Sequence, residues 1–103
     1  MIVERLTFQA KYGQGDALVG LVREFNATVK AKGLPPIARV YVDRTGPMFT
    51  AIWDMEYKDM AALAAADAGE RSMYSDPDFQ AWFGKMMPLV DRGERQLLEA
   101  IDL

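Results

Sequence analysis

The fold is decided by residues 37–57, which read IARVYVDRTGPMFTAIWDMEY. Two runs in which apolar and polar side chains alternate, 37–44 and 47–57, flank the pair Thr45-Gly46. Alternation of this kind is typical of β-strands, because successive side chains of a strand point to opposite faces. A glycine-containing pair between two such runs is typical of a hairpin turn. The stretch therefore predicts two antiparallel strands joined by a tight turn.

The register of this hairpin assigns its side chains to two faces. A turn at Thr45-Gly46 places Val42 opposite Phe49 and Val40 opposite Ala51. One face is then apolar and carries Ala38, Val40, Val42, Phe49, Ala51, Trp53, Met55 and Tyr57. The other carries Arg39, Tyr41, Asp43, Met48, Thr50, Ile52, Asp54 and Glu56. We expect the first face in the core, whereas the second is too polar for a dry core and too apolar for open water.

The segments before the hairpin predict a strand and a helix. Residues 2–11 alternate as a half-buried strand. From Asp16 onward, apolar side chains recur at intervals of three and four, the spacing of one helix face. These side chains are Leu18, Leu21, Val22, Phe25 and Val29. Gly33 and the following prolines are expected to end this helix.

The segments after the hairpin predict helix in two pieces and a final strand. Asp59 is a capping residue for an alanine-rich helix over 60–68, which Gly69 is expected to weaken or end. Asp76-Pro77 predicts a new helix start. An apolar stripe follows, made of Phe79, Trp82, Phe83, Met86 and Met87, and Pro88 closes the helix. The last strand is predicted from about residue 94 to residue 101.

The predicted order of elements is β-α-β-β-α-β, the order of a ferredoxin-like α+β fold with a four-stranded antiparallel sheet. One layer of helices covers only one face of such a sheet. We therefore expect a second copy of the chain to cover the other face, which gives a homodimer of the α+β barrel type. The residues assigned to this dimer face are Arg39, Tyr41, Thr50, Ile52 and Asp54. The polar ones either pair across the interface or bind a small polar molecule.

Composition restricts the available chemistry. The chain has 103 residues, half of them hydrophobic, which suits a single domain over 1–103. It contains no cysteine and no histidine, which excludes thiol nucleophiles, Cys/His zinc sites, iron–sulfur ligation and imidazole acid–base catalysis. Asp54 and Glu56, without a third ligand, are a weak signal for a divalent cation. We predict no metal and no cofactor, and the sequence assigns no catalytic residue.

Charge and hydropathy restrict partners and location. Twelve basic and fifteen acidic residues give a net charge of −3 and are dispersed along the chain, so nucleic acid is not an expected partner. The longest apolar run, residues 60–66, is far shorter than the roughly 20 residues that cross a bilayer. Residues 1–5 run directly into the predicted strand and lack the pattern of a secretory signal. The expected location is the cytoplasm, with no membrane partner.

Three stretches, in order, carry a resemblance to a known family. Residues 4–13 contain an acidic residue and a Thr-aromatic pair before a Lys-x-Gly turn. Residues 46–57 begin Gly-Pro-Met and end Met-Glu-Tyr, and residues 76–81 read DPDFQA, followed later by Pro88-Leu89. Together they resemble the NIPSNAP family of the dimeric α+β barrel superfamily. The sequence departs from the family pattern at Leu6, where an arginine is frequent, and at Met55, where a tryptophan is frequent.

The resemblance implies a dimeric α+β barrel fold, with a pocket between the sheet and the helices. Small bacterial members of the family mostly have no assigned reaction. The superfamily also includes quinone-forming monooxygenases, which need no cofactor and therefore no histidine. Haem degradation, another activity of the superfamily, is disfavoured because this chain has no histidine to bind the iron.

Glu4 is the most informative single residue of the sequence. It shares a strand face with Ile2, Leu6 and Phe8, where a carboxylate is costly unless it is paired or hydrated. One interpretation is an acid–base or hydrogen-bonding group in a cleft, with a perturbed pKa. The other is an ion pair with a residue such as Arg95, or exposure near the end of the strand.

The aromatic and apolar residues Trp53, Met55, Tyr57, Phe79 and Trp82 are, with Glu4, the candidate ligand pocket. They line a cavity for a small apolar or aromatic ligand or, alternatively, form a filled core. Two functions follow from the sequence. The first is a homodimeric module that binds a small molecule or a protein and has no assigned reaction. The second is a cofactor-free monooxygenase that acts on an aromatic or quinone-type substrate.

Overall fold

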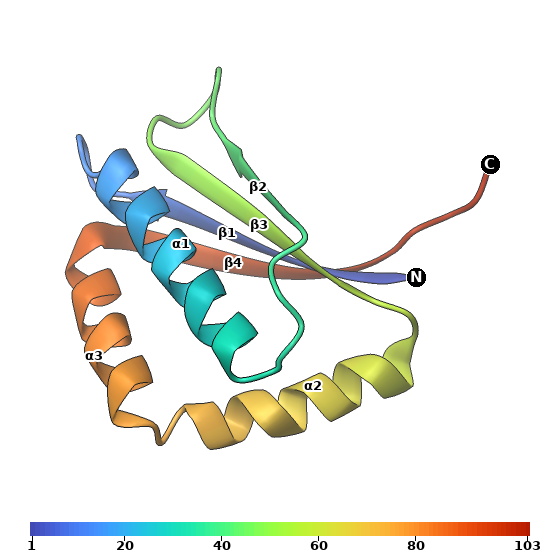
Figure 1. Ribbon diagram of the computed structural model, residues 1–103. Coiled ribbons are helices and arrows are strands. Elements are labelled where there is room, and N and C mark those ends of the chain that lie inside the picture. Colours follow the sequence, from blue (N-terminus) through green and yellow to red (C-terminus); the bar gives the residue numbers. More distant parts are fainter.

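The computed structural model describes residues 1–103 and contains the elements of a ferredoxin-like α+β fold (Figure 1). In chain order these are β1 (Ile2–Ala10), α1 (Gly15–Ala31), β2 (Arg39–Val42), β3 (Thr50–Tyr57), α2 (Met60–Met73), α3 (Pro77–Met86), a 3₁₀ turn (Met87–Leu89) and β4 (Val90–Glu99). The strands form one sheet in the order β2-β3-β1-β4, and all neighbouring pairs are antiparallel. The predicted fold class is confirmed.

Local signals explain where the second and third helices begin. The Asp59 carboxylate accepts a hydrogen bond of 2.8 Å from the amide of Ala62 and caps α2. The Asp76 carboxylate accepts one of 2.8 Å from the amide of Asp78 and caps α3, directly before Pro77. Both caps occupy amides at a helix N-terminus that have no partner within the helix. These two helix starts agree with the sequence prediction.

The alanine-rich helix does not end at Gly69, which was one of the two outcomes predicted there, because α2 continues to Met73. The glycine allows the side chain of Leu34 to approach the helix closely. A Cβ atom at position 69 would lie 2.7 Å from the Cδ2 atom of Leu34, in the segment that follows α1. A glycine in a helix costs about 1 kcal/mol relative to alanine, which the surrounding packing tolerates. The extension of α2 brings residue 70 to the interior.

The predicted hairpin register is wrong by two residues. Val42 lies opposite Ala51 and Val40 opposite Trp53, because β3 begins at Thr50 rather than at Pro47. The turn is wider than two residues: the Asp43 carboxylate accepts a hydrogen bond of 2.9 Å from the amide of Thr50 and closes the loop. A shift of two leaves every side chain on its predicted face, since two residues is the repeat of a strand.

Strand β4 begins earlier than predicted, at Val90 instead of residue 94. The early segment pairs with β1, with a register shift between Gln9 and Ala10. Gly93 lies opposite Phe8, and a Cβ atom at position 93 would lie 2.5 Å from the Phe8 ring. The ring therefore covers the glycine and stacks on Trp53, with 4.8 Å between the ring centroids. This glycine belongs to the strand and makes room for an aromatic side chain.

All three helices lie on the same side of the sheet, so the molecule has two layers (Figure 1). Its dimensions are 40 × 38 × 18 Å, and the short dimension corresponds to the thickness of one sheet and one layer of helices. The core lies between the layers and includes Leu18, Val22, Ala51, Trp53, Met55 and Leu63.

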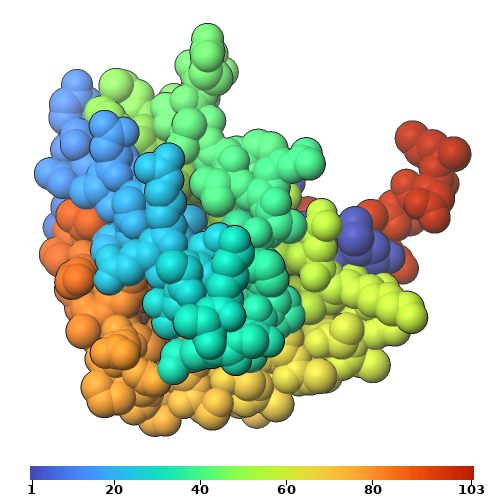
Figure 2. All heavy atoms as spheres, in the orientation of Figure 1, coloured from blue at the N-terminus to red at the C-terminus, as the bar shows by residue number.

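Edge strand β2 departs from the prediction: Val42, expected in the core, is 56% exposed, and all four β2 residues are exposed. Figure 2 shows the C-terminal residues projecting from the body.

Candidate functional site

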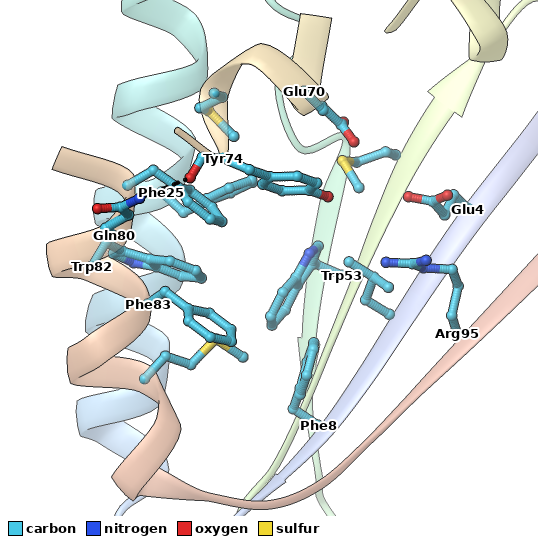
Figure 3. Close-up of a pocket in the computed structure, with 15 residues that line it drawn as sticks. Glu4, Phe8, Phe25, Trp53, Glu70, Tyr74, Gln80, Trp82, Phe83 and Arg95 are labelled. Atoms are coloured by element: carbon cyan, nitrogen blue, oxygen red, sulfur yellow. Dashed lines mark hydrogen bonds between the residues drawn. The ribbon is translucent and has the colours of Figure 1, made fainter. Parts of the chain in front are cut away.

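A cavity of about 510 Å³ lies between the sheet and the helices (Figure 3). The strands contribute Glu4, Leu6, Phe8, Trp53, Met55 and Arg95. The helices and the α2–α3 connection contribute Phe25, Glu70, Met73, Tyr74, Phe79, Gln80, Trp82, Phe83 and Met86. The volume is in the range of small-molecule pockets, and most of the lining is apolar, as in such pockets generally.

The aromatic wall of the cavity is held by contacts between the helices. The Trp82 indole on α3 donates a hydrogen bond of 2.7 Å from Nε1 to the carbonyl oxygen of Leu21 on α1. Its ring packs against Phe25, with centroids 5.0 Å apart, and against Phe79, with centroids 5.7 Å apart. The Phe79 ring in turn packs against Tyr74 at 5.1 Å. These contacts position α3 and keep the aromatic side chains in a continuous wall.

The charged residues of the cavity gather at one end. Figure 3 shows Glu4, Glu70 and Arg95 together, on the far side of Trp53 from Phe25 and Trp82. Glu4 comes from β1, Glu70 from α2 and Arg95 from β4. Glu4 is only 9% exposed, yet it takes part in none of the ion pairs or side-chain hydrogen bonds of the chain. Buried carboxylates are normally paired, so Glu4 lies in the cavity wall without the partner that such a group usually has.

Burial changes the ionisation of these carboxyls. Loss of hydration raises the pKa of Glu4, an effect that Arg95 partly offsets and that Asp67 reinforces. The pKa of Glu70 is raised by burial and by the charges of Glu4 and Asp67. Burial and the same carboxylates also raise the pKa of the Tyr57 hydroxyl, which stays protonated. For both carboxyls the loss of hydration therefore outweighs the attraction of the Arg95 guanidinium.

The raised pKa values predict how stability depends on pH. In the window between the ordinary carboxyl pKa of 4.5 and the raised values, the folded state holds protons that the unfolded state has released. The free energy of unfolding should therefore increase as the pH falls from neutrality through this window. Glu70→Gln should flatten this dependence and stabilise the protein at neutral pH. Urea denaturation of both proteins across the window measures the effect.

The control for this prediction is Glu24→Gln, a change at an exposed residue of α1 whose carboxylate lies 3.5 Å from the Lys85 ammonium. It should leave the slope unchanged. Asp76 acts in the opposite direction at lower pH, because the hydrogen bonds from Lys32 and from the Asp78 amide lower its pKa below 3.8. Its contribution is present above that value and is lost only as the pH falls further. Identical slopes for the wild type and Glu70→Gln would contradict the burial of Glu70.

Trp53 contains a buried polar group without a hydrogen-bond partner. The residue is only 2% exposed, and its buried indole nitrogen has no hydrogen-bond partner. A buried donor without an acceptor costs about 1–3 kcal/mol. The nitrogen atom itself is covered, so a molecule in the cavity would reach it only after neighbouring side chains shift. The ring, rather than the nitrogen, forms the accessible part of the wall.

Most of the residues assigned to the pocket from sequence do line the cavity: Glu4, Trp53, Met55, Phe79 and Trp82. Tyr57 does not. It is buried outside the lining, and its hydroxyl lies 3.9 Å from the Met55 sulfur, within hydrogen-bond distance. Glu4 neither pairs with Arg95 nor lies exposed at the strand end, because it is buried in the cavity wall with a perturbed pKa. Leu6 and Met55, where the sequence departs from the NIPSNAP pattern, both line the cavity.

The pocket predicted from sequence did not include Glu70 or Arg95, although Arg95 was named as a possible partner of Glu4. Glu70 lies on the part of α2 beyond Gly69, where the helix was predicted to end. Arg95 faces the cavity because Leu6 lies opposite it in the β1–β4 register, which places both side chains on the helix face of the sheet. The alternation of β4 is a sequence signal for this face, but it becomes informative only when the partner strand and the register are known.

The face of the sheet away from the helices carries the residues assigned to the dimer face. Arg5 on β1 and Asp54 on β3 form a two-point ion pair, with Nε–Oδ1 and Nη2–Oδ2 distances of 2.8 and 2.9 Å. The Arg5 guanidinium also lies 5.7 Å from the centre of the Tyr41 ring. Asp54 is only 6% exposed, and both of its oxygens are occupied within the chain. It therefore needs no charged partner from another subunit and no cation.

The sheet order, the one-sided helix layer and the cavity define an α+β protein of the ferredoxin-like class, with its pocket between the two layers. More specifically, the chain has the fold of NIPSNAP-family structures. It superposes on an uncharacterised NIPSNAP domain protein from Burkholderia xenovorans with a TM-score of 0.80 and 17% identity, over 98% of this chain and 95% of the other. A NIPSNAP-family protein from Agrobacterium tumefaciens C58 gives 0.78 and 23%, over 98% and 93%.

The same fold occurs in a second group of solved structures. A putative antibiotic biosynthesis monooxygenase from Deinococcus radiodurans superposes with a TM-score of 0.65 and 13% identity, over 100% of this chain and 95% of the other. No protein-family model and no curated protein matches the sequence. At these identities the likeness establishes the fold. None of the helices is long and apolar enough to cross a bilayer.

Proposed function

We propose that this protein is a homodimeric module that binds a small apolar or aromatic ligand in the cavity between the sheet and the helices. The observation that carries the proposal is the cavity of about 510 Å³, with aromatic walls and three charged groups at one end. A ligand with an apolar body and one polar group would pack its body against the aromatic walls and place its polar group beside the charged residues. The proposed location is the cytoplasm, since a chain without cysteine needs no oxidising compartment.

Ligand binding can be tested with a variant that fills the cavity. Leu6→Trp adds an indole to the cavity wall opposite the helices and should abolish the binding of small aromatic compounds. Tyr12→Trp, at an 82% exposed residue, is the matched control and should bind as the wild type does. Native mass spectrometry of the purified protein detects what co-purifies, and calorimetry measures the binding of aromatic probes. Equal binding by Leu6→Trp and the wild type would contradict the proposed site.

The dimer is supported by the surface that one chain leaves uncovered. The chain exposes 6806 Å², whereas a folded monomer of 11.5 kDa typically exposes about 5,800 Å². The whole excess is of the order of the roughly 800 Å² that each partner of a stable complex buries, and the projecting residues 101–103 account for part of it. Thr50, Ile52 and Tyr41 lie on the uncovered face, which we propose as the contact between two copies.

Sedimentation of the purified protein tests the dimer. We expect a dimer at micromolar concentration, and Ile52→Arg should convert it to a folded monomer, because it places a charge in the middle of the contact. Ala64→Arg, at an exposed residue of α2, is the matched control and should remain dimeric. Tyr41→Ala combined with Arg39→Ala should weaken the dimer. A wild-type protein that sediments as a stable monomer would exclude the proposed assembly.

A second candidate function is a cofactor-free monooxygenase that acts on an aromatic or quinone-type substrate. It is favoured by one specific observation: Glu4, a buried carboxyl with a raised pKa, lies in an aromatic cavity of a fold shared with proteins named as antibiotic biosynthesis monooxygenases. In this role Glu4 would accept a proton from the substrate. Oxygen uptake in the presence of polyphenolic compounds, lost in Glu4→Gln, would support it. Binding without oxygen uptake would favour the non-catalytic module.

A further inference from the structure

We propose that the cavity selects organic monocations, that is, amines or related nitrogen cations with an aromatic or alkyl body. The inference rests on the proposed small-molecule site and adds the charge of its ligand. It follows from three features that the cavity combines: an excess of carboxyls at one end, an unpaired carboxyl among them, and a wall of aromatic rings beside them.

The first feature is the charge balance. The ionisable groups at or near the polar end are Glu4 on β1, Tyr57 on β3, Asp67 and Glu70 on α2, Tyr74 in the α2–α3 connection and Arg95 on β4. Three carboxyls and one guanidinium therefore lie at or near this end of the cavity. A single positive charge from a ligand would bring this group closer to neutrality.

The second feature is an unpaired carboxyl aimed at the cavity. Glu4 is more than nine-tenths buried, lines the cavity and has no ion-pair or side-chain hydrogen-bond partner within the chain. Figure 3 shows its carboxylate at the same end as that of Glu70. An ammonium group placed between them would donate charge-assisted hydrogen bonds, which are stronger than hydrogen bonds between neutral groups.

The aromatic wall favours the same ligand charge. Tyr74 and Trp53 stand between the charged end and the rest of the cavity, and Phe8 is stacked on Trp53. Faces of aromatic rings attract cations, and enclosed aromatic sites are a recurrent way to bind ammonium groups. Since an aromatic face gives no such stabilisation to an anion, the wall adds to the discrimination made by the carboxyls.

Arg95 is the group that would favour the opposite charge. A ligand carboxylate could pair with its guanidinium, but it would then lie among the carboxyls of Glu4, Glu70 and Asp67. Arg95 lowers the pKa of Glu4, but by less than the loss of hydration raises it, so the guanidinium does not offset the burial of this carboxyl. A neutral ligand would leave the buried Glu4 carboxyl without a partner. A cation would both pair with Glu4 and reduce the excess of negative charge.

Three compounds with one phenethyl body test the inference: phenethylamine, phenethyl alcohol and hydrocinnamate. We expect the amine to bind about tenfold more tightly than the alcohol, and the carboxylate most weakly, in calorimetry at slightly alkaline pH. The affinity for the amine should fall as the pH is lowered through the raised pKa values of Glu4 and Glu70, because protonation removes their charge. The affinity for the alcohol should change little.

Substitutions test whether the charges of the lining residues, rather than the shape of the cavity, produce the preference for the amine. Glu4→Gln and Glu70→Gln should each reduce binding of the amine about tenfold and leave the alcohol unaffected, whereas Arg95→Gln should strengthen binding of the amine. Glu24→Gln, at an exposed residue of α1, is the control and should bind like the wild type. Since the three-compound comparison needs only the wild type, a variant that fails to fold does not prevent the test.

The outcomes distinguish the two proposals. If the alcohol or the carboxylate binds as tightly as the amine, the preference for a cation is wrong and the small-molecule site still stands. If none of the three compounds binds at millimolar concentration, the small-molecule site itself is contradicted. If the amine is preferred but Glu4→Gln and Glu70→Gln bind it as tightly as the wild type does, the cation is bound elsewhere and the inference fails.

Discussion

Trp82→Ala should lower the free energy of unfolding by about 3–5 kcal/mol, the usual cost of truncating a buried tryptophan. Trp82 is buried between α1 and α3, in contact with Phe25 and Phe79. The substitution removes this packing together with the hydrogen bond of 2.7 Å to the Leu21 carbonyl oxygen. Chemical denaturation at a fixed protein concentration measures the loss.

Two further variants identify the cause. Trp82→Phe keeps an aromatic ring but loses the indole donor, so its cost should lie between those of the wild type and the alanine variant. Phe83→Ala, at a neighbouring residue of α3 that is about half exposed, should cost about 1 kcal/mol or less. If Trp82→Ala costs no more than Phe83→Ala, Trp82 does not anchor α3. The cavity wall would then lack the support that we assign to it.

The second large effect is expected at the uncovered face of the sheet. Arg5→Met should lower the free energy of unfolding by about 2–3 kcal/mol, because it leaves the buried Asp54 carboxylate without its partner. The value is below that of a fully buried pair, since about a third of the Arg5 side chain is accessible to water. The loss is measured by denaturation, as for Trp82.

The control is Arg23→Met. Arg23 is an exposed residue of α1, away from the proposed dimer face, and forms no ion pair, so its replacement should change stability by less than about 0.5 kcal/mol. The double variant Arg5→Met, Asp54→Leu removes both charges and should recover most of the stability lost in Arg5→Met. Equal effects of Arg5→Met and Arg23→Met would show that the pair contributes nothing.

These two contacts matter for the site because each holds one side of it. The Trp82 hydrogen bond joins α3 to α1 and positions the aromatic wall. The Arg5–Asp54 pair joins β1 to β3, the strands that present Glu4 and Trp53 to the cavity from their other face. A pocket with walls held in this way exists before a ligand enters, which reduces the cost of ordering it on binding.

The sequence alone determined the fold class, because the signals for it are local. Alternation over residues 2–11 and 47–57 predicts strands wherever their partners lie, and the caps Asp59 and Asp76 predict helix starts from the residues that follow them. The two-residue repeat of a strand also explains why an error of two in the hairpin register left the faces correct. Glu4 was identifiable because a carboxyl interrupts an apolar face.

The tertiary structure alone decided which charged groups meet. Glu70 reaches the cavity because α2 continues through Gly69 where Leu34 packs against it, and Arg95 reaches it through the pairing of β4 with β1. Both depend on contacts between residues far apart in the chain, which no local pattern specifies. Whether aromatic side chains at strand and helix spacing fill a core or surround a cavity is likewise set by how far the two layers stand apart, and that distance results from the packing of all of their side chains together.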